Sequence, residues 1–83
     1  MEEMSMVNQE DDRNFIRQRV GKKIAELRIQ KKLSLRQLSV ISGIEASHIS
    51  KIEKGKHAAG LDILGRICEA LDADIIIKER ESV

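Results

Sequence analysis

A glycine at position 43 separates two short segments with helical hydrophobic spacing, and this junction constrains the fold more than any other feature. In the segment before it, apolar residues recur every three positions, which is enough for a two-turn helix: Leu35, Leu38 and Ile41. Ser34 and Gln37 form an S-x-x-Q capping box, in which each side chain bonds the other residue's backbone N–H. Glycine tolerates the left-handed conformation that closes a helix. The sequence therefore predicts a short helix that begins after Ser34 and ends at Gly43.

A second short helix is predicted from about Ala46 to Lys54, with Ile49 and Ile52 facing inward and Gly55 ending it. Two short helices joined at a glycine, inside a largely helical domain, are the ingredients of a helix-turn-helix motif.

Longer helices are predicted on both sides of this motif. Asp12 can cap the first one, which ends near Lys31–Lys32 and carries an apolar stripe: Ile16, Val20, Ile24 and Leu27. The other spans about Leu61 to Leu71, and its inward face is Leu61, Leu64, Ile67, Cys68 and Leu71. Cys68 on that face is expected to be a small buried group and not a reactive thiol. The fold class is therefore all-α, a bundle of four main helices.

Three consecutive β-branched residues, Ile75, Ile76 and Ile77, predict a short C-terminal strand bounded by charged residues. A lone strand has no hydrogen-bond partner inside a helical domain. The same segment of a second copy, antiparallel across a two-fold axis, would supply one, so these isoleucines are candidate dimerisation residues. The alternative is a fifth short helix that packs its isoleucines on the core.

At 83 residues the chain holds one domain. A domain of this size buries only roughly 60% of its unfolded surface, so oligomerisation would stabilise it. We divide the chain into an acidic, mobile tail (1–12), the helix-turn-helix domain (13–72) and a C-terminal strand and tail (73–83). Neither a signal peptide nor a membrane span is expected. The single cysteine fits a reducing compartment, so we expect a cytoplasmic protein.

The net charge of +1 conceals a strong segregation of charge. Residues 13–60 carry twelve basic and three acidic residues, whereas residues 61–83 carry three basic and six acidic ones. A basic central segment predicts a surface that faces a polyanion. Phe15 is the only aromatic residue, so bases have nothing to stack on, and duplex DNA is favoured over single strands.

The segment from Leu33 to Lys56 resembles the phage-repressor and Cro-type helix-turn-helix family, including the lambda repressor. The similarity covers about residues 15–72, and six residues match the motif positions: Leu38, Gly43, Ile49, Ile52, Glu53 and Gly55. The resemblance implies a transcriptional regulator, most often a repressor, that binds duplex DNA as a homodimer on a palindromic operator. It also implies that Arg28 and Glu53 form a structural ion pair and do not contact DNA.

The exposed face of the second motif helix is the candidate base-reading surface, and the residues are Ala46, Ser47, Ser50 and Lys51. Residues at these spacings lie side by side on a helix, so they can meet adjacent base edges. Candidate phosphate-contacting residues lie on either side of that face: Arg36, Gln37, His48, Lys54, Lys56 and His57. Two positions depart from the family pattern. Leu35 replaces a DNA-contacting Gln, and Glu45 is a poor N-cap.

The sequence offers three alternatives to a DNA-binding regulator. An enzyme is disfavoured because His48 and His57 lack a carboxylate pair, a metal-ligand spacing or a phosphate loop around them, and no cofactor, metal or small-molecule ligand is expected. The C-terminal strand also resembles the antitoxins of toxin–antitoxin pairs, which would add a toxin protein as a partner. A protein-binding adaptor on the same scaffold is the remaining alternative, although it does not require the basic segment.

Overall fold

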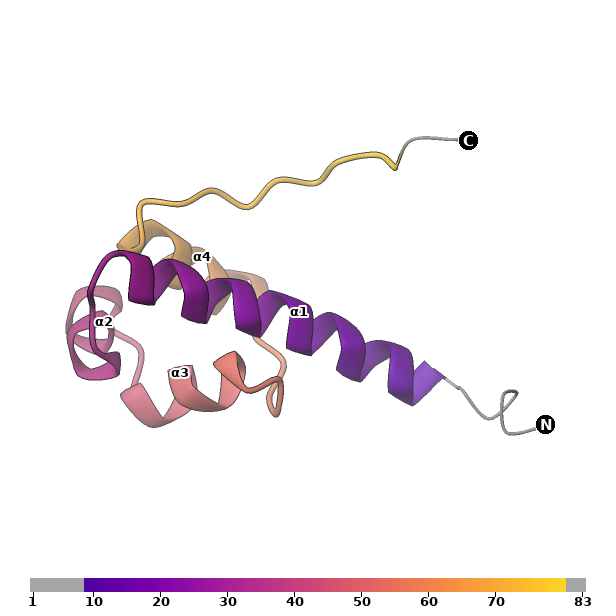
Figure 1. Cartoon of the computed structure of the whole chain (residues 1–83), viewed down its shortest axis with the longest axis horizontal. Coiled ribbons are helices and arrows are strands. Elements are labelled where there is room, and N and C mark those ends of the chain that lie inside the picture. Colours follow the sequence, from indigo (N-terminus) through magenta and orange to yellow (C-terminus); the bar gives the residue numbers. More distant parts are fainter. Residues whose placement is uncertain (1–8, 81–83) are drawn as a thin grey trace.

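The computed structural model of the chain describes residues 9–80. Within them lie four helices: α1 (Gln9–Gln30), α2 (Leu35–Ser42), α3 (Ala46–Glu53) and α4 (Leu61–Ala70). Helices α2, α3 and α4 gather around the C-terminal half of α1 (Figure 1). The predicted all-helical bundle is confirmed, and no helix in this part of the chain is both long and apolar enough to cross a membrane.

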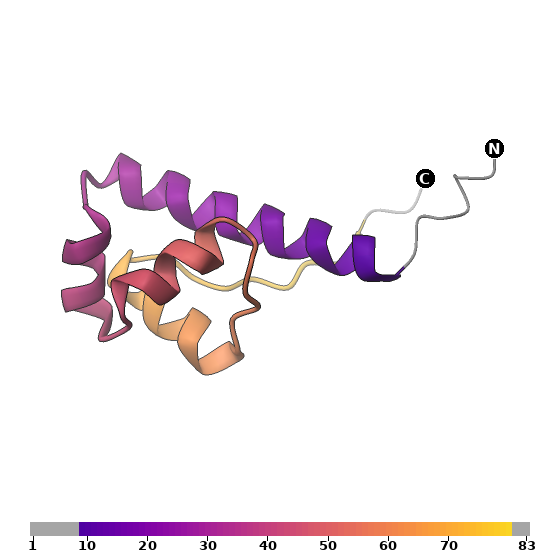
Figure 2. The ribbon, with the colours of Figure 1, turned by 90° about the horizontal axis from the view of Figure 1, so that it is seen from below.

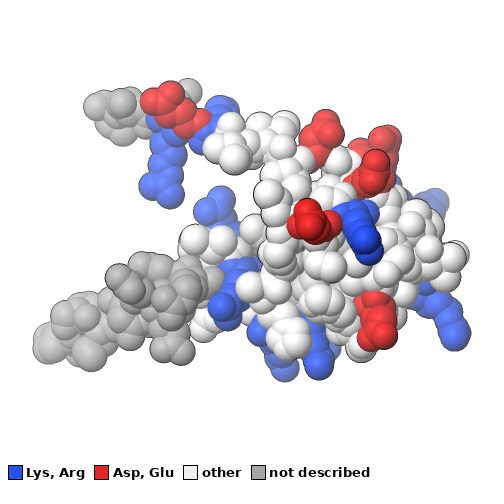
Figure 3. Space-filling view, turned by 180° about the vertical axis from the view of Figure 1, so that it is seen from behind, with Lys and Arg blue, Asp and Glu red and all other residues white. Residues whose placement is uncertain are grey.

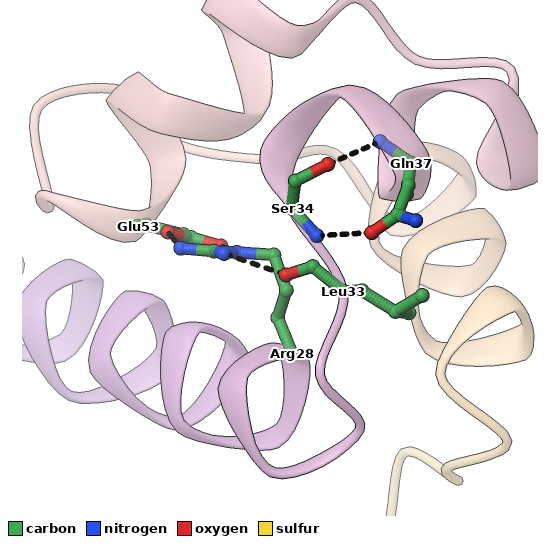
Figure 4. Close-up of polar contacts among 5 residues, drawn as sticks. All are labelled: Arg28, Leu33, Ser34, Gln37 and Glu53. Carbon is green, nitrogen blue, oxygen red and sulfur yellow. Dashed lines mark hydrogen bonds and ion pairs between the residues drawn. The ribbon is translucent and has the colours of Figure 1, made fainter.

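The ends of α2 are formed as the sequence predicts. Ser34 Oγ accepts a hydrogen bond from the Gln37 backbone N–H at 3.0 Å, and Gln37 Oε1 accepts one from the Ser34 N–H at 2.7 Å (Figure 4). Gly43 has a φ of 78° and donates its N–H to the Ser39 carbonyl. Because a left-handed residue strains any side chain with a Cβ, glycine suits this position.

Other helices end through the same geometry. After α3, Gly55 has a φ of 76°, and the Lys56 N–H bonds the Lys51 carbonyl at 2.9 Å. After α1 and α4 the left-handed residues are Lys32 and Asp72, with φ values of 59° and 56°. Lys32 therefore adopts a conformation that costs an L-residue free energy.

The core draws on all four helices and the turn between α2 and α3. The buried apolar residues are Ile24, Leu38, Ile44, Ile49, Ile52, Ile67 and Leu71. Helix α1 crosses α3 at Gly21, where a Cβ would lie 2.2 Å from the Ile52 carbonyl oxygen. The two backbones touch there, and this close approach fixes the position of α3.

Two expectations about α1 were wrong. The helix begins at Gln9 and not after an Asp12 cap, because once a helix is nucleated, good helix formers such as Gln and Glu extend it at little cost. Residues 1–8 of the expected tail lie outside the described residues. The apolar stripe is buried only at Ile24 and in part at Leu27, whereas Ile16 and Val20 are exposed. The reason is that the N-terminal half of α1, residues 9–20, projects beyond the other helices (Figure 2). We call this half the arm.

At the start of α4, the expected core residue Leu61 is exposed. It is the first residue of the helix, and the first residue of α4 that packs against the core is Ile63. In α2, Ile41 is also exposed, so fewer residues of that helix face inward than the three-residue spacing of its apolar residues suggests.

The strand expected at Ile75–Ile77 is not found, and neither is the alternative fifth helix. Residues 73–80, which we call the C-terminal segment, follow an irregular, extended path (Figure 1). A strand requires a hydrogen-bonded neighbour, and residues 9–80 offer it none. Ile76 and Ile77 remain 78% and 96% exposed. The segment projects from the bundle at the same end as the arm in both views of the ribbon (Figures 1 and 2).

Candidate nucleic-acid interface

Helix α3 is held rigidly between α1 and α2. Ile49 and Ile52 are buried on its inner face, and Ile44 anchors the turn that precedes it. In that turn Ser42 Oγ accepts a hydrogen bond from the Ile44 N–H at 3.1 Å. Because this inner face is fixed at several points, the outer face of α3 is presented in one orientation.

The four candidate base-reading residues lie together on the outer part of α3. Ser47 and Lys51 are exposed, whereas Ala46 and Ser50 are half-buried. Ser47 and Lys51 are separated by one helical turn, so their side chains can reach neighbouring base pairs. Ala46 offers only a methyl group there, and a methyl group can contact the C5-methyl of thymine. The surface therefore has few hydrogen-bonding groups for reading bases.

The candidate phosphate-contacting residues flank α3 on two sides. Arg36 and Gln37 are exposed in the first turn of α2, and Lys54, Lys56 and His57 are exposed after α3. The Gln37 side-chain oxygen is already used in the capping box, so only its amide N–H groups are free to donate to a phosphate. His48, on α3 itself, is half-buried.

His48 and His57 contact each other, which the sequence did not suggest. Their ring centroids lie 5.9 Å apart in an edge-to-face arrangement. The loop after α3 curls back because the His57 N–H reaches the Lys51 carbonyl at 3.4 Å, next to the closer bond from Lys56. This contact fixes the position of the loop that carries Lys54 and Lys56. In the sequence, only Gly55 indicates that the chain turns back at this point.

Glu53 turns inward from the last turn of α3 and binds Arg28. The Arg28 Nε donates to Glu53 Oε2 at 2.7 Å, and Arg28 Nη2 donates to Glu53 Oε1 at 3.0 Å (Figure 4). Arg28 Nη1 also donates to the Leu33 carbonyl at 2.9 Å. The hydrogen bonds to Glu53 raise the pKa of Arg28, and burial partly opposes that rise. The two side chains are only 15% and 9% exposed, and they link α1, the α1–α2 turn and α3.

Glu45 occupies the N-cap position of α3 and makes no side-chain cap hydrogen bond. Its side chain is exposed beside the candidate base-reading residues. A carboxylate at this position repels phosphate unless it accepts a hydrogen bond from a cytosine amino group.

Charge is distributed unevenly over the surface. Most of the acidic side chains visible from behind lie over α4 and the start of the C-terminal segment, whereas basic ones predominate along the lower edge, the side on which α3 lies (Figure 3). Among residues 14–80, whose side chains the structure describes, no three His, Cys, Asp or Glu side chains come close enough to hold a metal ion.

A sequence profile of the helix-turn-helix family matches residues 24–76, which contain all of α2, α3 and α4. The chain belongs to the Cro/C1-type helix-turn-helix family. An uncharacterized HTH-type transcriptional regulator of Sinorhizobium fredii (strain NBRC 101917 / NGR234), y4dL, is 36% identical to it over 62 residues. The alignment covers 75% of this chain and 32% of that relative. The helix-turn-helix itself is α2, the turn at Gly43 and α3, so α3 takes the position of the recognition helix in that family.

Proposed function

We propose that this helix-turn-helix protein is a sequence-specific transcriptional regulator, a repressor that binds a palindromic operator in duplex DNA as a homodimer. The observation that carries the proposal is the recognition helix, whose inner face is buried and whose outer face leaves Ser47 and Lys51 exposed. The exposed lysines after the helix support it, because phosphate contacts orient a protein on DNA while base contacts specify sequence. Repression requires only that the bound dimer occupies the operator.

Dimerisation is part of the proposal, and the exposed isoleucines Ile75, Ile76 and Ile77 support it. Two recognition helices in one dimer would read half-sites about 34 Å apart, one turn of the duplex. Because Ile76 is exposed, Ile76→Lys should leave the helical domain folded and reduce the sedimentation mass to that of the monomer. A mass that stays at the dimer value would show that the C-terminal segment is not part of the dimer interface.

The operator is best identified by selecting bound sequences from a random duplex pool. Fluorescence anisotropy on the selected duplex and on a scrambled one then gives two affinities for each variant. Lys51→Ala should cost about 1–3 kcal/mol on the selected duplex and much less on the scrambled one, since Lys51 is assigned to a base edge. Equal losses on both duplexes would contradict that assignment.

Lys56→Ala provides the comparison for a phosphate contact. It should weaken binding to all sequences alike. It should also reduce the salt slope, which is the slope of the logarithm of the binding constant against the logarithm of the salt concentration, by about one unit. Arg66→Ala is the matched control, because Arg66 is an exposed base on α4, and its removal changes the net charge by the same amount. It should change neither the sequence preference nor the salt slope by a comparable amount.

The salt dependence also separates this proposal from the adaptor alternative. A protein that contacts six to ten phosphates loses roughly 10³–10⁵ in affinity between 50 and 200 mM salt. An adaptor would instead bind every duplex weakly and with little salt dependence. An antitoxin would bind its operator in the same way as a repressor but would also have a toxin protein as its partner, which an adjacent toxin gene would indicate.

A further inference from the structure

The loop between α3 and α4, residues 54–60, lies directly against the arm of α1. At Gly55 a Cβ would lie 2.6 Å from Gln18 Cγ and 3.0 Å from Gln18 Cα, so a side chain at position 55 has no room. Figure 2 shows the loop beside α1. Next to this contact is a hollow of about 230 Å³, bordered by the arm, the loop and residues of α3 and α4. The loop and the arm together therefore form a cavity outside the DNA-facing surface of α3.

The walls of this hollow are mostly apolar and only partly covered. Ile52, which is 2% exposed, and Leu64 belong to the packed bundle. On the arm, Ile16 and Val20 border the same hollow but are 59% and 38% exposed. Binding sites for small molecules are concave, mostly apolar and carry only a few polar groups. The hollow has this character, and it leaves apolar surface for a ligand to cover.

Two side chains that can carry positive charge also border the hollow. Arg17 is half-buried on the arm, and His57 is exposed in the loop. None of the described residues that border the hollow is acidic. The charge therefore favours an anionic ligand, and the planar fork of an arginine matches a carboxylate. A carboxylate fits better than a phosphate group, because one guanidinium balances its single charge, whereas a phosphate group carries about −1.5 to −2.

The volume of the hollow sets the size of the apolar part of the ligand. A dry apolar cavity of about 150 Å³ holds one benzene molecule. A hollow of about 230 Å³ therefore has room for a group of that size and for a carboxylate attached to it. The sequence predicts no small-molecule ligand, because the residues that border the hollow come from positions as far apart as 16 and 64.

His57 connects the hollow to the recognition helix. It borders the hollow and also contacts His48 of α3, with the ring centroids 5.9 Å apart. The same loop carries Lys54 and Lys56, which are candidates for phosphate contacts. A carboxylate held at Arg17 and His57 would neutralise positive charge beside these lysines, so DNA phosphates would be attracted less strongly. The ligand and DNA would then each lower the affinity for the other by the same factor.

We propose that this hollow binds a small apolar carboxylic acid, whose carboxylate meets Arg17 and His57, and that the bound acid weakens the binding of DNA. The apolar body of the ligand is a single ring or a short branched chain that covers Ile16 and Val20. The effect on DNA rests on the proposed function, whereas the binding site itself does not depend on it. The ligand would thus release the regulator from its operator.

Benzoate is the probe for the site, and NMR spectroscopy of the full-length chain measures its binding. The methyl resonances of Ile16, Val20 and Ile52 should shift with benzoate concentration and saturate at one site. Benzyl alcohol and benzylamine keep the ring but carry a neutral and a positive group in place of the carboxylate. Both should bind at least about fivefold more weakly than benzoate, because they cannot accept charge-assisted hydrogen bonds from Arg17. Equal affinities for the three compounds, or shifts without saturation, would overturn the site.

Arg17→Gln tests the assigned carboxylate contact. It should reduce the affinity for benzoate about tenfold and leave the affinity for benzyl alcohol nearly unchanged, since only the charge-assisted contact is lost. Arg19→Gln is the matched control, because it removes the same charge from the arm. Arg19 lies over the Phe15 ring, 5.6 Å from its centroid, and does not border this hollow. Equal losses of benzoate affinity in the two variants would overturn the assignment of Arg17.

Fluorescence anisotropy on the selected operator tests the effect on DNA. Saturating benzoate should raise the Kd for DNA about fivefold or more, within the usual range of coupling between two sites. Sodium chloride at the same ionic strength controls for screening. Ala58→Phe places an uncharged ring in the hollow, so this variant should lose the response to benzoate and keep its affinity for DNA. Saturation of the hollow without a rise in Kd would overturn the regulatory role.

These outcomes distinguish the inference from the function on which its second half rests. If benzoate does not bind while Lys51→Ala and Lys56→Ala change DNA binding as expected, the inference is overturned and the proposed function stands. If benzoate saturates the hollow of a chain that binds no duplex, the site stands and the proposed function is overturned. A sedimentation mass that falls on addition of benzoate would assign the hollow to a second copy of the chain and overturn the ligand site.

Discussion

The ion pair between Arg28 and Glu53 gives the sharpest test of how the recognition helix is held in place. Replacing Arg28 with Met removes two hydrogen bonds to Glu53 and one to the Leu33 carbonyl. A hydrogen bond to a charged group contributes about 1.5–3 kcal/mol, so the two bonds to Glu53 amount to about 3–6 kcal/mol. Because some water would reach the Glu53 carboxylate, we expect Arg28→Met to lower the free energy of unfolding by about 3–5 kcal/mol.

That loss is large for a chain of this size. A domain with roughly 0.05–0.15 kcal/mol of stability per residue would lose about a quarter or more of its total. Each kcal/mol corresponds to about 4–8 °C in Tm for a domain of 60–100 residues, so the expected fall is about 12–40 °C. Arg36→Met is the matched control because Arg36 is exposed on α2. Its effect should stay within about 0.5 kcal/mol.

A double-mutant cycle separates the ion pair from other effects of the substitutions. Arg28→Met/Glu53→Leu replaces both charges with apolar groups, so it should unfold within about 1.5 kcal/mol of the wild type. The coupling free energy from urea unfolding at fixed protein concentration should then be at least about 1.5 kcal/mol. At temperatures where it is folded, the double variant should bind the selected operator as the wild type does, since neither side chain faces DNA. Strictly additive single effects would refute the reasoning.

Three further predictions concern the backbone and Cys68. Gly21→Ala should lower the free energy of unfolding by about 2 kcal/mol, because the new Cβ would meet the Ile52 carbonyl oxygen. Gly65→Ala should raise the free energy of unfolding by about 0.5–1 kcal/mol, because the space around Gly65 is open. Urea unfolding of the two variants must therefore give changes of opposite sign. Lys32→Gly should raise it by up to about 1 kcal/mol, and a destabilised variant would show that Lys32 bears no strain. Burial, and to a smaller extent the charge of Asp74, raises the pKa of the Cys68 thiol in the folded protein. The stability that the neutral thiol contributes is therefore fully present below the pKa of the unfolded thiol, about 8.5. It is lost as the pH rises through the pKa of the folded protein. Cys68→Ala should abolish that alkaline loss in urea unfolding, and an unchanged pH profile would assign it to another group.

The parts of this fold that depend on a few neighbouring residues were predictable from the sequence. The Ser34–Gln37 capping box and the left-handed Gly43 need only partners within four residues, and both are present. The inward positions of Ile49 and Ile52 follow from helical periodicity in the same way.

The features that were not predicted depend on distant residues or on the extent of packing. Periodicity identified Ile16 and Val20 as one face of α1, but it carries no information on where the packed bundle ends. β-branched residues at 75–77 favour extended backbone, but a strand also needs a partner, and the described chain lacks one. The contact between His48 and His57, and the crossing at Gly21, join residues whose proximity is set only by tertiary structure.

The division of α3 into inward-facing and outward-facing positions has a consequence for how such proteins diversify. Ile49 and Ile52 point inward with almost no exposure, while Ser47 and Lys51 are exposed on the other side of the helix. Substitutions at the outward positions therefore carry little cost in folding stability, as is usual for exposed sites. A gene duplicate can accumulate new outward residues, acquire a different DNA target and keep an intact fold throughout. One scaffold can in this way generate a set of regulators that recognise different targets.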